Sequence, residues 1–180
     1  MPRFVALFRG INVGRAKRIA MADLRALLES LGYGGVRTLL NSGNAVFEGP
    51  AGPPATHARR IQAAVAGTLG VESLVIVKSA KDMAAVVAGN ALAAIATDPS
   101  RLLVALTQDA QALAALDALA QAQWGGDELH VGTPAAYLWC ANGILESKLA
   151  VALLKGLATS GTTRNWATIE KINALLQEAA

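Results

Sequence analysis

The chain has 180 residues, of which 53% are apolar and 16% charged, and its net charge is +3. A chain of this length and apolar content buries about 70% of the surface that it exposes when unfolded, which excludes an intrinsically disordered protein. No uncharged stretch reaches the ~20 residues that a transmembrane helix needs, so we expect no membrane span.

The first half of the chain alternates strand and helix patterns. Apolar runs predict strands, leucines at helical spacing predict helices, and glycines mark their ends. In order, we expect a strand at 4–8, a helix at 21–31, strands at 36–40 and 44–47, a helix at 55–69 and a strand at 71–77. This βαββαβ order is typical of ferredoxin-like domains, and we assign it to a subdomain of residues 1–79.

The second half repeats much of this order without a clear repeat of residues. We expect a helix at 81–96, a strand at 101–107, a helix at 110–121, strands at 128–131 and 135–140, and helices at 147–157 and 163–176. Residues 80–180 are therefore predicted to form a related βαββα subdomain with an extra C-terminal helix. The fold class is α/β (α+β), with two packed subdomains.

Two predicted strands are apolar on both faces, at 74–77 and at 102–106. Successive side chains of a strand point to opposite faces of a sheet, so both sheet faces are expected to be covered, by the other half or by added helices. Loops then become the expected location of a functional site.

Basic residues gather at the start of the chain. Five cations, Arg3, Arg9, Arg15, Lys17 and Arg18, precede the first acidic residue, Asp23. The loop from Arg9 to Lys17 also holds Gly10, Asn12 and Gly14 directly after the first strand, and glycines let successive backbone N–H groups converge on an anion. The spacing matches neither a Walker loop nor a dinucleotide fingerprint, and the alternative is two turn glycines in a solvated loop.

The predicted turn contains Asn41, Ser42, Gly43 and Asn44, residue types that hairpin turns commonly use. In the βαββαβ topology the first and second strands run in the same direction. The basic loop and this turn are therefore expected to be neighbours at one edge of the sheet and to form the polar opening of a ligand-binding site.

Two later segments add possible anion contacts. Thr163 is placed as the N-cap of the last helix, followed by Arg164 and Asn165, and a helix N-terminus favours anions. Ser147 and Lys148 begin another predicted helix, where a cap alone is the simpler interpretation.

Conventional catalytic signatures are missing. His57, His130 and Cys140 lack metal-ligand spacing, and Ser42 lies in no nucleophile elbow. We therefore expect no metal and no cofactor, and leave open whether the protein is an enzyme. The single cysteine and the absence of a secretory signal pattern at the start favour the reducing cytoplasm.

These motifs together resemble an uncharacterised bacterial family, the domain-of-unknown-function family 1697. The resemblance rests on Arg9-Gly10-Ile11-Asn12-Val13-Gly14, on Met21 with Leu24-Arg25, on Ser42–Phe47, on Ser147-Lys148-Leu149 and on Thr162–Thr168. This chain departs from the family pattern at Arg15, where the family has a second glycine, and at Ala167. The resemblance implies a two-part fold built on ferredoxin-like units and no established activity.

We therefore predict a protein that binds a phosphate-bearing or other anionic small ligand. The alternatives are an RNA-binding module, or an interaction protein without catalysis; the sequence determines no oligomeric state. The candidate ligand-binding residues are Arg9, Asn12, Gly14, Lys17, Asn41, Ser42, Gly43, Asn44, Lys148, Thr163, Arg164 and Asn165.

Overall fold

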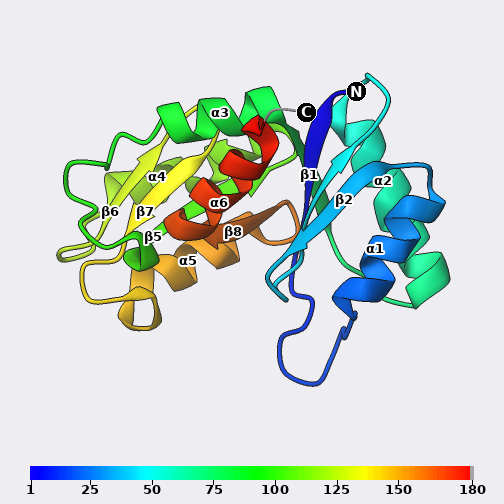
Figure 1. The fold of residues 1–180 in the computed structure, drawn as a ribbon. Helices are drawn as coiled ribbons and strands as arrows, with labels where there is room; N and C mark the ends of the chain where they lie inside the picture. The colour runs from blue at the N-terminus through cyan, green and yellow to red at the C-terminus, as the bar shows by residue number, and fades with distance from the viewer. Residues whose placement is uncertain (179–180) are drawn as a thin grey trace. The chain divides into compact units, whose positions relative to one another are not determined.

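The structure is a computed structural model that describes residues 1–178. It divides into two compact units, drawn in Figure 1. Unit 1 contains Met1–Lys81 together with the chain from Ile172 onward, and unit 2 contains Asp82–Lys171. The sequence places the boundary after residue 79 and the whole last helix in the second subdomain, whereas this division assigns the end of that helix to unit 1.

Unit 1 has the predicted ferredoxin-like order of elements. They are β1 (Arg3–Phe8), α1 (Met21–Ser30), β2 (Gly34–Leu39), β3 (Asn44–Glu48), α2 (Pro54–Ala64) and β4 (Val75–Ser79). The strands form one antiparallel sheet in the order β2-β3-β1-β4. Helices α1 and α2 lie on one side of this sheet, and Figure 1 shows them there.

The core of unit 1 lies between the sheet and its two helices. Phe4, Phe8 and Phe47 from the strands pack with Leu24 of α1 and Ile61 of α2, and all five are buried. Burial of large apolar side chains is the main stabilising contribution to such a core. The apolar residues of the predicted strands and the apolar faces of the two helices therefore meet in the same layer.

The end of α2 and the start of β4 differ from the sequence prediction. The helix continues into a π-helical turn, η1 (Val65–Leu69), and ends at Gly70, whose φ is +66°. The predicted strand at 71–77 instead begins at Val75. One reason is that the Ser73 hydroxyl donates to the carbonyl of Arg9 at 2.8 Å, which ties this segment to the end of β1 before the ladder begins.

Unit 2 contains a second sheet of four antiparallel strands in the order β6-β7-β5-β8. Helix α3 (Ala80–Ala88) begins in unit 1 and continues into unit 2. The elements that follow it are η2 (Pro99–Arg101), β5 (Leu102–Thr107), η3 (Ala110–Leu116), α4 (Asp117–Gln121), β6 (Glu128–Val131), β7 (Ala136–Trp139), η4 (Ile144–Glu146), α5 (Lys148–Leu157), β8 (Gly161–Asn165) and α6 (Trp166–Gln177). The predicted helix at 110–121 is a 3₁₀ helix, η3, that continues into the short α4.

The predicted start of the last helix is wrong. Residues Gly161–Asn165 form β8, which pairs with β5 so that Arg164 lies opposite Val104. The helix begins at Trp166, and the Asn165 side chain, not Thr163, accepts the hydrogen bond from Thr168 N at 2.9 Å. The second unit is thus βαββαβ rather than βαββα, with the same strand order as unit 1.

The predicted helix at 81–96 is also too long, because α3 ends at Ala88. A Cβ at Gly89 would lie 2.8 Å from the Tyr137 hydroxyl, so only glycine fits there. The Asn90 side chain then accepts from Leu92 N at 3.1 Å, a local turn that competes with a helix.

Strands β4 and β5 are buried on both faces, as their apolar patterns predict: Val75, Ile76 and Val77 in one, and Leu102–Leu106 in the other. Among the helices of residues 1–178, none is long and apolar enough to cross a bilayer.

Candidate functional site

The basic loop after β1 is held in place by the side chain of Asn12. Its amide nitrogen donates to the carbonyls of Ile19 and Asn41, each at 2.8 Å, and its oxygen accepts from Ile19 N at 2.8 Å. The Asn12 backbone N–H also donates to the carbonyl of Lys17 at 2.9 Å, which closes the loop on itself. Both amide hydrogens are used, so Asn12 positions the loop.

The predicted hairpin turn lies directly against this loop. Phe8 N donates to the carbonyl of Gly43 at 3.0 Å, and a Cβ at Gly43 would lie 2.6 Å from Ile11 Cδ1. Asn44 is buried, and its amide donates to the carbonyl of Leu39 at 2.8 Å and to the Ser42 hydroxyl at 3.2 Å. The expectation that the loop and the turn are neighbours is confirmed, and Gly43 and Asn44 supply the packing that joins them.

The loop backbone alternates in conformation. Gly10, Asn12 and Gly14 have φ values of +68°, +56° and +63°, and Lys17 has +51°. Alternation between right- and left-handed residues is how backbone N–H groups form an anion-binding concavity. Arg15 is not among the residues with positive φ, so its side chain, where the resembled family has glycine, causes no backbone strain.

The cationic side chains of the loop are exposed to solvent. Within residues 1–178, Arg15, Lys17 and Arg18 make no ion pair, and Arg18 donates to the carbonyl of Gly14 at 3.0 Å. Arg9 is half-buried, and its backbone N–H donates to the carbonyl of Leu74 at 3.0 Å. These residues give the loop a positive potential with no acidic side chain between positions 9 and 22.

A cavity of about 340 Å³ opens where the loop meets the turn. Its lining residues are Asn12, Arg18, Ile19, Ala20 and Asn41. Asn41 and Ser42 are exposed, so their side chains are accessible beside it. Of the candidate residues, Arg9, Asn12, Gly14, Lys17 and Asn41–Asn44 thus belong to one loop and turn cluster of unit 1.

The remaining candidate residues belong to unit 2. Arg164 is buried in β8, where its guanidinium donates to the Thr162 hydroxyl at 2.9 Å and to the Thr163 carbonyl at 2.8 Å. Burial lowers the pKa of Arg164 to about 10, so it stays charged at neutral pH. Lys148 is the exposed first residue of α5, and Ser147 caps that helix by accepting from Ala150 N at 2.9 Å.

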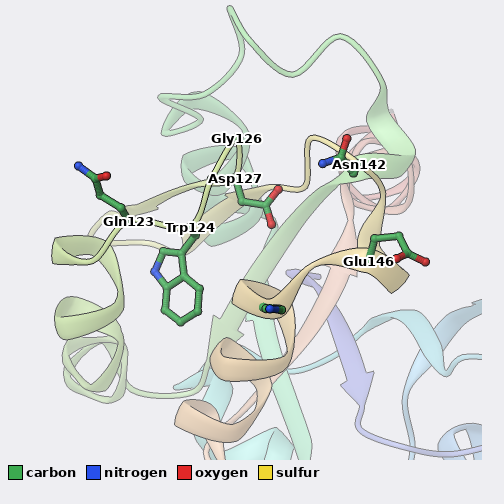
Figure 2. A pocket seen from close by; sticks show the side chains of 8 residues that line it. Gln123, Trp124, Gly126, Asp127, Asn142 and Glu146 are labelled. Carbon is green, nitrogen blue, oxygen red and sulfur yellow. The ribbon is translucent and has the colours of Figure 1, made fainter.

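Unit 2 also has a cavity, of about 380 Å³, that the sequence prediction missed apart from Lys148 (Figure 2). It lies at the turn Trp124–Asp127, between α4 and β6. One sequence signal could have pointed to this cavity. Trp124 is followed by two glycines in a segment between a predicted helix and a predicted strand, and glycines have no side chains that could cover the indole ring.

Histidine and cysteine have structural surroundings. His57 is buried, with Nδ1 2.9 Å from the Tyr33 hydroxyl and Nε2 3.1 Å from the Pro50 carbonyl oxygen. Cys140 is a buried free thiol, and burial raises its pKa. No group of three or more potential metal ligands occurs within residues 1–178.

Comparison with known proteins shows a similar fold but no activity. The chain is similar to the conserved bacterial protein SP0830 from Streptococcus pneumoniae, with a TM-score of 0.80 and 24% identity over 98% of this chain and 99% of that one. This likeness supports the two-unit fold.

No curated protein matches the chain. The model of the protein family of unknown function DUF1697 matches residues 1–137, which confirms the resemblance to this family. The match ends before two of the motifs that suggested it, Ser147–Leu149 and Thr162–Thr168. The chain belongs to the DUF1697 family.

Proposed function

We propose that unit 1 binds a phosphate-bearing or other anionic small ligand where the basic loop meets the hairpin turn. The observation that carries this proposal is the combination of exposed Arg15, Lys17 and Arg18 with a loop whose shape Asn12 holds. A preformed loop loses little conformational entropy on binding, so more of the electrostatic attraction contributes to affinity.

Each part of this cluster would have a separate role. Arg18 and the exposed Asn41 side chain border the cavity and can donate to anionic oxygens. Gly14 keeps the loop in its left-handed turn, and Asn12 joins the loop to the turn. Lys17 adds charge at the rim, where it raises the local concentration of anions.

An anionic small ligand fits unit 1 better than RNA bound on the sheet. Sheet-bound RNA stacks on exposed aromatic side chains of the central strands. In unit 1 the aromatic residues of β1 and β3 are Phe4, Phe8 and Phe47, and all three are in the core with α1 and α2. The cavity of about 340 Å³ is in the range of small-molecule sites.

We also propose that the protein works in the cytoplasm. The chain has one cysteine, Cys140, which is free and buried, and a reducing compartment suits a protein that uses no disulfide.

A thermal-shift experiment tests ligand binding. Inorganic phosphate, ATP and a sugar phosphate are added to the full chain, and a ligand that binds the folded state raises the melting temperature. We expect at least one of them to do so, and to do so less with Arg18→Gln. Lys155→Gln removes an exposed lysine of α5 in unit 2 and should respond like the wild type.

Two results would count against the proposal. One is that none of the three anions raises the melting temperature. The other is that Arg18→Gln and Lys155→Gln respond equally, which would place the binding elsewhere. A steep loss of binding to a single-stranded RNA with added salt, together with no response to the small anions, would favour the RNA alternative.

A further inference from the structure

The turn Trp124–Asp127 of unit 2 holds an indole ring in a fixed position. Trp124 Nε1 donates to the carbonyl of Leu119 at 2.8 Å, and a β-bridge joins Trp124 to Asp127. Gly125 has a φ of +68°, which completes the tight turn. Trp124 is half-buried, so part of the residue remains accessible while its Nε1 is anchored.

Cavities lie along this turn. The one in Figure 2 has a volume of about 380 Å³, and a second, of about 330 Å³, is lined by the same Gln123, Trp124, Gly125 and Asp127. Each volume is in the range that small-molecule sites occupy. Trp124 thus lines both cavities.

Asp127 makes the framework of the first cavity. Its carboxylate accepts from Ala141 N at 2.8 Å and from the Ser147 hydroxyl at 2.7 Å. Ser147 in turn caps α5. The turn, the segment after β7 and the start of α5 are therefore held together by one side chain, and the cavity between them is preformed.

The other polar side chains of the cavity are not used by the fold. Gln123, Asn142, Glu146 and Lys148 line it and are exposed. None of the four makes a side-chain hydrogen bond or an ion pair with another residue in the part of the chain that the structure describes. Figure 2 shows Asn142 and Glu146 on one side of the cavity and Gln123 and Trp124 on the other. Two amides, a carboxylate and an ammonium group thus line the same cavity as one aromatic ring.

We infer that this cavity is a binding site for a neutral saccharide. A sugar ring has apolar C–H groups on its faces, which suit an indole, and hydroxyls at its edge, each of which both donates and accepts. The amides of Gln123 and Asn142 also donate and accept, Glu146 accepts, and Lys148 donates. Such a mixed set satisfies hydroxyls in several orientations.

The charges of the cavity argue against an anion. Its lining has two carboxylates, Asp127 and Glu146, and one ammonium group, Lys148, so an anion meets more repulsion than attraction. The class of ligand therefore differs from the anion proposed for unit 1, and the two sites can be tested separately.

The test is a titration followed by NMR of the tryptophan indole N–H signals. The chain has three tryptophans, Trp124, Trp139 and Trp166, so each signal can be assigned with a Trp→Phe variant. Glucose, galactose, mannose, N-acetylglucosamine, maltose and cellobiose are added to the full chain at millimolar concentrations. We expect at least one of them to shift the Trp124 signal saturably and leave the Trp166 signal in place.

The variants replace side chains that make no hydrogen bond or ion pair in the described part of the chain, so they should change binding without disturbing the fold. Glu146→Gln removes a charged acceptor and should weaken the saccharide's affinity about tenfold. Asn142→Ala should weaken it as well. The matched control is Glu72→Gln, which changes an exposed glutamate of unit 1 and should leave the affinity unchanged.

The inference is overturned if no saccharide shifts the Trp124 signal. It is also overturned if inorganic phosphate shifts that signal and the sugars do not, or if Glu146→Gln and Asn142→Ala both bind like the wild type. None of these results bears on anion binding in unit 1, because Arg18→Gln tests that site independently.

Discussion

The side-chain amide of Asn12 donates a 2.8 Å hydrogen bond to the main-chain carbonyl of Asn41, 29 residues later in the chain. Its other hydrogen bond as a donor goes to Ile19. One side chain therefore closes the basic loop and joins it to the hairpin turn. The shape of the candidate anion site depends on this residue more than on the cations around it.

Asn12→Asp should lower the free energy of unfolding by about 2–4 kcal/mol. Aspartate tolerates the positive φ, but an ionised carboxylate cannot donate and would face the carbonyls of Ile19 and Asn41. Urea unfolding measures the change. Asn142→Asp, at an exposed amide without a partner, should change stability little; an equal loss in both variants would contradict the role of Asn12.

Lys17→Gly should stabilise the protein by about 0.5–1 kcal/mol. Lys17 has a φ of +51°, a conformation that costs a residue with a side chain ~1–2 kcal/mol, and glycine's greater entropy in the unfolded chain cancels part of the gain. Arg15→Gly removes the same charge from the same loop at a residue without positive φ, so it should destabilise by about 0.5–1 kcal/mol. Thermal unfolding measures the stability of the two variants. If both gain or both lose stability, the difference in φ between Lys17 and Arg15 does not govern their effect.

Gly43→Ala should destabilise unit 1 by at least about 3 kcal/mol. The new Cβ would lie 2.6 Å from Ile11 Cδ1 and 2.8 Å from Phe8 Cβ, at a φ of +89°. Gly14→Ala has a similar φ, +63°, but no atom within 4 Å of the Cβ, so only the ~1–2 kcal/mol of backbone strain applies. Chemical denaturation should rank the two variants in this order. The close approach of loop and turn would be refuted by equal losses.

Stability should fall as the pH rises from about 10 to about 12, in part because of Tyr137. Its hydroxyl donates to the carbonyl of Val86 at 2.6 Å, and burial raises its pKa from 10.0 to about 12. The unfolded chain loses this proton first, so its contribution to stability is complete below pH 10 and lost above it.

Urea unfolding across this pH range measures the effect, with Tyr137→Phe as the comparison. The variant should be less stable at pH 8, because the Val86 carbonyl loses its donor, and its stability should depend less steeply on pH. Parallel pH curves for the two proteins would show that Tyr137 does not titrate as its burial requires.

Local patterns in the sequence determined the ferredoxin-like order of unit 1 and the adjacency of the basic loop and the turn. Helical leucine spacing, apolar strand runs and turn residues at 41–44 depend on neighbours in the chain, and topology then brings the ends of β1 and β2 to one edge. The concentration of cations before Asp23 needed only counting.

Tertiary structure decided the remainder. The sequence predicts the start of a helix at residues 163–165. They belong instead to β8, because this segment pairs with β5, and no local pattern contains the hydrogen bonds of that pairing. Likewise, Asn12 resembles a ligand contact in the sequence, but its two carbonyl partners use its donors. The cavity at Trp124 is formed by segments around 123–127 and 142–148, which only packing brings together. These features depend on contacts between distant segments. The free energy that stabilises them comes from packing and strand pairing, which form only when the chain folds.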